Sequence, residues 1–327
     1  MPAQERIERR QPYRRWLALG FSLALTAATL YFVLRGIDQQ VLQHLLATQN
    51  RSLLLAAAIF LLLQIVLAGE RWRTILSASM EGQPPSILSA QAVFYSSIFF
   101  NSLPFGTIGG DVARVWLARR FAASVTQLVL SVLGDRILTI LALILLVVLT
   151  LPTISHPLVL TAWFVAAALF VVGVSGILLL ATIERMLRRW RRQRVMYLIL
   201  RMVEGLRFIR QPAGLVALFW ALSSGLASAF AAYFIARSLG IQVGPIAMIA
   251  VMSMVTLVAA LPISIGGWGV REASVVALLG LLGVDREAAL LLSVEFGLLN
   301  MLLSLPGGVI WLSLREHQRI GFSTAGN

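Results

Sequence analysis

The sequence predicts an all-α polytopic membrane protein that forms a single membrane domain over residues 1–327. Hydrophobic residues make up 59% of the chain and charged residues 13%, which is too little polar surface to cover a soluble protein of this size. Apolar stretches long enough to cross a hydrocarbon core, which takes about 20 helical residues, recur along the chain. A motif containing proline, paired glycine and arginine also occurs once in each half. Repetition of such a motif in a membrane chain is typical of a protein built from two repeats.

The net charge of +13 does not indicate nucleic-acid binding, because the basic residues lie between apolar stretches rather than among aromatics on a polar domain. All 27 basic residues are arginine, and they are better interpreted as topology signals that face anionic lipid. The chain has no cysteine, which excludes disulfides and thiol catalysis, and its three histidines are far apart. We therefore expect no metal site, and no motif for a cofactor or a nucleophile elbow is found.

Eight apolar stretches follow one another along the chain. The first follows five arginines within residues 6–15, has no clear cleavage site, and is expected to be a retained anchor with a cytoplasmic N-terminus. In order, the stretches cover about residues 16–34, 52–69, 84–110, 121–151, 157–183, 213–236, 238–270 and 288–314.

The topology depends on the segment 184–212, which carries nine arginines and is expected to be cytoplasmic. If all five preceding stretches crossed the membrane, this segment would lie outside. We therefore expect the stretch 84–110 to enter and leave on the same side as a re-entrant hairpin, which gives six full crossings and two oppositely oriented hairpins. The inverted repeat would then comprise residues 52–151 and 213–314, with both termini cytoplasmic. If 84–103 is a true crossing, the alternative is eight full crossings.

The segment 184–212 also contains apolar residues between its arginines. This pattern favours an interfacial helix on an anionic leaflet, and a solvated loop is the alternative.

The repeated motif reads Leu-Pro, a short spacer, Gly-Gly, three residues and Arg, at residues 103–114 and 261–271. Proline removes a helix donor, glycine frees the backbone, and an arginine in an apolar stretch is costly unless it has a function. Arg114 and Arg271 are therefore candidate ligands for an anionic headgroup, because a guanidinium can bind phosphate oxygens with two parallel hydrogen bonds. The alternative is an internal ion pair that holds each hairpin in place.

Polar side chains and exposed backbone N–H groups near each motif are expected to add contacts to the headgroup. These residues are Asn101, Thr107, Gly109, Gly110, Ser264, Gly266 and Gly267.

Each half also places one acid in the helix after its hairpin, Asp135 in the first and Glu295 in the second. Intramembrane acids are candidates for energy coupling, for pairing with the hairpin arginines, and for lining a central cavity shared by both halves. Three further charges, Asp111, Arg136 and Glu272, are expected to pair nearby. By contrast, Glu70, Arg71 and Arg73 are expected to lie at the cytoplasmic edge of the second stretch as interfacial charges.

Together these motifs resemble the flippase-like membrane family that includes the transmembrane region of lysylphosphatidylglycerol synthase, the multiple peptide resistance factor. The resemblance covers about residues 16–316 and implies translocation of a lipid between leaflets of a bacterial inner membrane. It leaves the cargo open between an anionic phospholipid and a polyprenyl-phosphate-linked lipid. The residues that carry it are Phe100-Asn101-Ser102-Leu103-Pro104, Gly109-Gly110-Asp111-Val112-Ala113-Arg114, Gly134-Asp135-Arg136 and Leu261-Pro262-Ile263-Ser264-Ile265-Gly266-Gly267-Trp268-Gly269-Val270-Arg271-Glu272.

Two other classes of function stay open at this point. The same acids could serve an intramembrane enzyme that transfers or hydrolyses a lipid-linked group. The chain could also be a scaffold for a glycosyltransferase or lipid-synthase partner. An enzyme would convert lipid in detergent, whereas a flippase acts only across a sealed bilayer.

Overall fold

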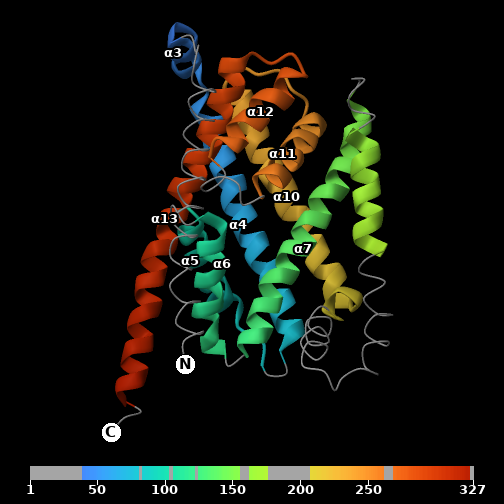
Figure 1. The fold of residues 1–327 in the computed structure, drawn as a ribbon. Helices are drawn as coiled ribbons and strands as arrows, with labels where there is room; N and C mark the ends of the chain where they lie inside the picture. The colour runs from blue at the N-terminus through green and yellow to red at the C-terminus, as the bar shows by residue number, and fades with distance from the viewer. Residues whose placement is uncertain are drawn as a thin grey trace, which may run out of the picture.

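The computed structural model describes residues 39–80, 83–102, 106–121, 124–154, 162–175, 207–260 and 268–324, and every regular element within these ranges is helical (Figure 1). The α-helices are α3 (Gln39–Thr48), α4 (Arg51–Ser79), α5 (Ile87–Asn101), α6 (Gly106–Ala118), α7 (Val125–Thr150), a helix at Ala162–Ser175, α10 (Pro212–Ser238), α11 (Pro245–Ala259), α12 (Val270–Gly280) and α13 (Arg286–Thr324). Single turns of 3-10 helix are η1 (Arg119–Phe121), η2 (Leu151–Thr153) and η4 (Arg207–Arg210).

Four of the described helices are long and apolar enough to cross a membrane: Arg51–Ser79, Val125–Thr153 (α7 with η2), Pro212–Ser238 and the Arg286–Leu314 part of α13. The helices α4 and α10 have 29 and 27 residues and are about 44 and 40 Å long at the helical rise. Both exceed the hydrocarbon core of a membrane, which is about 30 Å thick. The helices α5 and α11 have 15 residues each and reach only about 22 Å.

The order of long and short helices is the same in both halves. A long helix, two short helices and a second long helix follow one another as α4, α5, α6 and α7, and again as α10, α11, α12 and α13. The break predicted within the stretch 84–110 is present, because α5 ends at Asn101 and α6 begins at Gly106. The Leu-Pro pairs of both motifs lie outside the described residues.

Local sequence accounts for the helix boundaries. Asn50, Ser86 and Ser124 cap the N-termini of α4, α5 and α7 with their side chains, and Ser124 and Gln127 form a reciprocal capping box. Proline occupies the first turn of α10 and α11, where its missing N–H costs nothing.

The contacts between helices have a two-fold symmetrical pattern. Each helix of the first half (α4, α5, α6 and α7) has an equivalent in the second (α10, α11, α12 and α13), and equivalent helices make equivalent contacts. The contact of α5 with α13 has its counterpart in α11 with α7, and that of α4 with α13 in α10 with α7. The central pair, α4 and α10, is antiparallel, since the Asn50 N–H before α4 donates to the Ser238 carbonyl at the end of α10, 3.1 Å away. In Figure 1 the α5–α6 pair therefore lies toward one end of the long helices and the α11–α12 pair toward the other.

Small residues allow α10 to lie close against α4. Most buried positions of α10 are alanine, glycine or serine, and small residues at a helix interface are the usual means of close approach in membranes. The main core surrounds this pair and includes Leu61 of α4, Ile235 of α10 and Met248 of α11. Close packing of the central pair joins the two halves along most of their length.

One predicted boundary was wrong. The stretch expected to end near residue 69 continues as α4 to Ser79, through Glu70, Arg71 and Arg73. Charges do not end this helix because they have partners within the protein. Glu70 pairs with Arg73 at 2.7 Å and accepts a hydrogen bond from Gln91 of α5.

Candidate functional site

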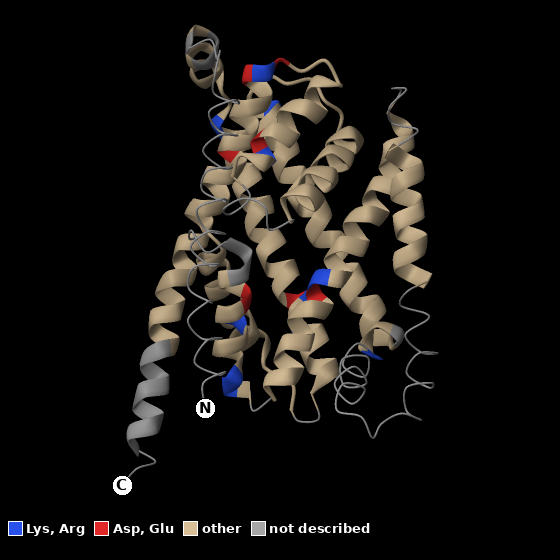
Figure 2. Ribbon diagram, in the orientation of Figure 1, with Lys and Arg blue, Asp and Glu red and all other residues tan. Residues whose placement is uncertain are grey.

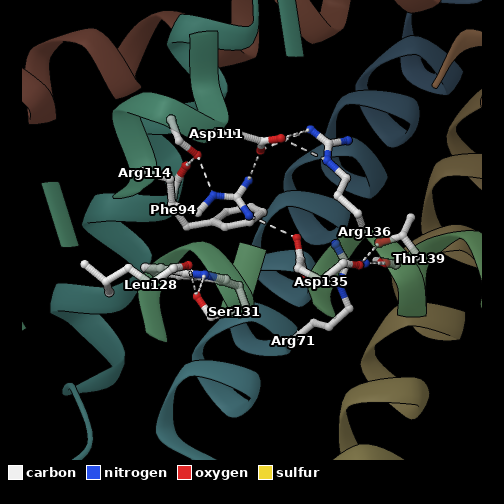
Figure 3. Close-up of polar contacts among 12 residues, drawn as sticks. Arg71, Phe94, Asp111, Arg114, Leu128, Ser131, Asp135, Arg136 and Thr139 are labelled. Atoms are coloured by element: carbon white, nitrogen blue, oxygen red, sulfur yellow. Dashed lines mark hydrogen bonds and ion pairs between the residues drawn. The ribbon is translucent and has the colours of Figure 1, made fainter. Parts of the chain in front are cut away.

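Asp135 of α7 lies at the centre of a buried group of charges between α4, α6 and α7 (Figure 3). One carboxylate oxygen accepts from Arg71 Nε at 2.6 Å and the other from Arg114 Nη1 at 3.0 Å. The three residues are each between 3 and 6% exposed. We call the set Arg71, Asp111, Arg114, Asp135 and Arg136 the Asp135 cluster.

Arg114 is held on several sides. Its Nε donates to Ser97 Oγ of α5 at 3.2 Å, and its guanidinium carbon lies 4.5 Å from the ring centre of Phe94 and 5.6 Å from that of Trp72. Aromatic faces attract a desolvated guanidinium, so these rings help to stabilise a charge in an apolar surrounding. The predicted pairing of the hairpin arginine with the acid of the next helix is present in this half.

A second pair lies beside Arg114. Arg136 donates to both carboxylate oxygens of Asp111 at 3.0 to 3.2 Å, in the forked geometry typical of arginine and a carboxylate. Asp111 Oδ1 is also 3.9 Å from Arg114 Nη2. The Asp135 cluster thus contains three arginines and two aspartates, which leaves one positive charge in excess.

The Asp135 cluster borders a cavity of about 250 Å³. Charged lining comes from α4, α6 and α7 of the first half, as Arg71, Arg114, Asp135 and Arg136. Neutral polar lining comes mostly from α10, α11 and α13 of the second half, as Ser224, Ser228, Ser253, Thr256 and Asn300. Both halves therefore contribute to one polar cavity between membrane-spanning helices.

Of the candidate residues of the first motif, Gly110 has a packing role and Asn101 lines the cavity. A side chain at Gly110 would overlap the Asn101 amide and come within 2.5 Å of the Ser97 carbonyl oxygen, so this glycine allows α6 to lie against α5. Asn101 lines the cavity, and its buried Oδ1 has no hydrogen-bond partner. Gly109 and the backbone of Thr107 lie in the first turns of α6.

The second hairpin arginine lies in a different group of residues, which we call the Glu272 cluster: Trp268, Gly269, Arg271, Glu272 and Ser293. Arg271 donates to Glu272 Oε1 at 2.5 and 3.0 Å, and its guanidinium carbon lies 4.5 Å from the Trp268 ring centre. Glu272 is fully buried, and its other oxygen accepts from the Gly269 N–H at 2.5 Å at the start of α12. Gly269 has a φ of +84°, a conformation that favours glycine.

Two expectations for the second half were therefore wrong. Arg271 does not line the cavity beside Arg114, since the cavity's described lining includes no residue of α12. Glu295 does not pair with Arg271, because the carboxylate accepts both its short contacts from Gln49 Nε2, at 2.7 Å to each oxygen. In Figure 2 the charges of α12 lie toward one end of the molecule and those of α6 and α7 toward the other.

Sequence reasoning missed Arg71, which was expected at the cytoplasmic edge. The structure buries its side chain between Asp135 and Ser224, whose Oγ accepts from Arg71 Nη1 at 3.2 Å. A signal was available, since Arg71 follows a long apolar run and Asp135 needs a cation. The candidates Ser264, Gly266 and Gly267 lie outside the described residues, and so does most of the segment 184–212. Within the described ranges, no group of three or more His, Asp or Glu side chains is placed to hold a metal ion.

The fold, with four helices long and apolar enough to cross a membrane, defines a multi-pass membrane domain. The chain belongs to the family described as the lysylphosphatidylglycerol synthase transmembrane region, whose model matches residues 16–307. This agrees with the resemblance found in the motifs, and the family is the membrane region of a lipid-modifying protein. A search of curated proteins gave no match.

Proposed function

We propose that the protein is a flippase that moves a lipid with an anionic or phosphate-bearing headgroup between the leaflets of a bacterial inner membrane. The observation that carries this proposal is the cavity of about 250 Å³ between the two halves, which borders three buried or half-buried arginines and has one uncompensated positive charge. A buried excess charge is costly without a counterion, and a phosphate group would supply one.

Exchange of carboxylate for phosphate explains how the headgroup could bind and leave. Asp135 accepts from Arg71 and Arg114 with one oxygen each, so a phosphate can displace it from one guanidinium without leaving either arginine unpaired. The arginines pair with a carboxylate in the free state and with a phosphate in the occupied state. Because these interactions are of similar strength, the headgroup can dissociate again. The acyl or isoprenoid tail would stay in lipid between the helices.

The helix order supports the topology that such transport requires. We propose six crossings and two re-entrant hairpins, α5–α6 and α11–α12, which enter from opposite faces with both termini cytoplasmic. The antiparallel central helices and the positions of the two pairs at opposite ends of the molecule support this arrangement (Figure 1). Inverted repeats of this kind allow one site to open alternately to either side.

A headgroup-accessibility assay in liposomes tests the function. The purified protein is reconstituted with fluorescent phospholipids or polyprenyl phosphates, and a membrane-impermeant quencher measures the fraction of label that changes leaflet. We expect faster exchange of anionic lipid than in protein-free liposomes. Arg114→Lys should slow exchange about thirtyfold, since one charge-assisted hydrogen bond contributes about 2 kcal/mol and a point charge cannot replace the fork.

Arg119→Lys is the matched control, because Arg119 is exposed in η1 and the same substitution there leaves the cavity unchanged. Equal exchange by the wild type and the Arg114 variant would remove the proposed role of the arginine. Conversion of lipid in detergent would instead indicate an enzyme, and neither activity would indicate a scaffold for a synthase or glycosyltransferase partner.

A further inference from the structure

One arginine of the Asp135 cluster lies on the exposed side of α7. Val129, Leu133 and Ile140 of this helix are apolar and 40 to 44% exposed. Arg136 belongs to the same stripe, because it lies three residues after Leu133 and four before Ile140. Its side chain is 36% exposed, and it lies about 16 Å from the start of a helix long enough to cross the membrane. Ionisable residues at such depth mark the paths of substrates and ions.

The contact between α6 and α7 changes along its length from buried to exposed. At one end, Leu117 of α6 is fully buried in an apolar cluster shared with α7. Further along, Arg114 pairs with Asp135, and these side chains are 4 and 5% exposed. The next pair, Asp111 with Arg136, is 25 and 36% exposed (Figure 3). An ion pair therefore closes the accessible end of the α6–α7 contact.

The second half closes the equivalent contact differently. Val275 and Leu279 of α12 and Leu292 of α13 are fully buried members of the main core. Arg271 pairs with Glu272, its neighbour in the chain, so this ion pair is internal to α12. An apolar contact offers a phosphate group nothing to displace, whereas the contact between α6 and α7 offers a guanidinium.

We infer, on the basis of the proposed function, that Arg136 and Asp111 form a lateral entrance to the cavity. A lipid enters between α6 and α7 with its tail along the exposed stripe of α7, and its phosphate group binds Arg136 first. The phosphate displaces Asp111, whose carboxylate turns to Arg114. The entrance recognises a phosphate carried on a lipid, whatever substituent the phosphate bears.

Asp111 has this second partner within reach. Its Oδ1 lies 3.9 Å from Arg114 Nη2, one turn along the same helix. Arg136 holds the same carboxylate at 3.0 to 3.2 Å. A movement of about 1 Å brings Asp111 to ordinary hydrogen-bond distance from Arg114. The carboxylate therefore keeps a cationic partner while a phosphate occupies Arg136.

The same exchange closes the entrance behind the headgroup. When the phosphate moves inward from Arg136 to Arg114, it replaces Asp111 there. Asp111 then returns to Arg136 and restores the ion pair between α6 and α7. Asp135 meanwhile stays paired with Arg71. Each arginine has an anionic partner at every stage, which avoids the cost of an unpaired buried cation.

Two conservative variants distinguish an entrance from an ion pair with a structural role alone. Arg136→Gln and Asp111→Asn both remove the ion pair, so a structural role predicts effects of the same sign on exchange in liposomes. We expect Arg136→Gln to raise the half-saturating content of phosphatidylglycerol about tenfold, because a charged contact to phosphate is lost. Asp111→Asn should lower it about threefold, because the competing carboxylate is gone. Arg120→Gln in the exposed η1 turn is the control.

Photo-cross-linking locates the entrance with the ion pair intact. The chain has no native cysteine, so Leu133→Cys can carry a benzophenone group beside Arg136. Phosphatidylglycerol should be captured at least about fivefold more than diacylglycerol with the same tails, which has no phosphate. Leu149→Cys is the matched control and should show no preference, because Leu149 is exposed on the same helix about 20 Å beyond Arg136. Adding Arg136→Gln should abolish the preference at Leu133.

The outcomes separate this inference from the proposed function. Effects of the same sign in the two variants, or equal capture of both lipids at Leu133, would overturn the entrance and leave the flippase proposal standing. Preferential capture by folded protein that exchanges no lipid would support the entrance and overturn the flippase proposal. Glycerol phosphate added in water should leave capture unchanged. If it prevents capture, the ligand is a water-soluble phosphate and the lateral entrance is wrong.

Discussion

Replacing Asp135 with asparagine removes the carboxylate that holds two buried arginines. The substitution preserves the size of the side chain, so packing changes little, but Arg71 at 2.6 Å and Arg114 at 3.0 Å lose their counterion. Removing one partner of a buried ion pair costs about 3–5 kcal/mol, and here both cations are affected. We therefore expect the free energy of unfolding to fall by at least about 3 kcal/mol. The excess positive charge of the cluster also rises from one to two.

Two measurements follow from this reasoning. Denaturation in detergent micelles, monitored by circular dichroism, reports the loss of stability, with Asp285→Asn at the exposed start of α13 as the control. In liposomes, the greater positive charge should strengthen binding of anionic lipid and slow its release, so that exchange falls while half-saturation occurs at lower lipid content.

A double variant tests whether the loss of stability in Asp135→Asn is caused by the unpaired arginine charges. Adding Arg71→Gln to Asp135→Asn removes one of the two unpaired cations and should recover part of the lost stability. The reasoning is refuted if Asp135→Asn unfolds within 1 kcal/mol of the wild type, or if the two losses simply add.

Three further predictions concern the hairpins. Gly110→Ala should destabilise the protein by about 1–3 kcal/mol in the same denaturation experiment, because its new methyl group overlaps α5. Arg271→Ala should cost about 3–5 kcal/mol of stability, since it leaves Glu272 buried without its cation, yet change half-saturation by anionic lipid less than about twofold. Single cysteines at Ser102 and Ala260, at the ends of α5 and α11, should react with a membrane-impermeant maleimide from opposite sides of the membrane.

Each of these has a clear contrary result. Gly280→Ala is the control for Gly110→Ala, because a Cβ added at Gly280 would have nothing within 4 Å. Equal effects of the two substitutions on stability would contradict the packing role of Gly110. A large loss of lipid affinity in Arg271→Ala would place that arginine in the binding site. Labelling of both cysteines from one side would contradict opposed hairpins, and the absence of native cysteine makes this result unambiguous.

The sequence predicted the helices better than their ends. Apolar length and arginine position located the long and short helices, because both depend on the cost of burying polar groups in lipid. The end of α4 was misplaced for the same reason: Arg71 is costly alone, and its partner Asp135 lies 64 residues away in the chain. Ending a predicted helix at its first charged residue ignores ion pairs that form only when distant helices pack together.

The candidate site was predicted in part. The pairing of Arg114 with Asp135 followed from one charge of each sign in adjacent apolar helices of the same half. The corresponding expectation for Arg271 and Glu295 was wrong, because Arg271 has a nearer carboxylate in the next residue, and Glu295 lies beside Gln49. A repeat in the sequence therefore predicts equivalent backbone paths in the two halves more reliably than it predicts equivalent side-chain partners.

The contacts between the halves also affect how the chain can be made. Arg71 needs Ser224 for one hydrogen bond, Tyr95 donates to the Leu303 carbonyl at 2.6 Å, and Gln49 needs Glu295. A growing chain that has completed only α7 has none of these partners, so its polar groups must wait in the membrane until the later helices are inserted. The first half therefore reaches its full set of polar contacts only when the second half has been inserted beside it.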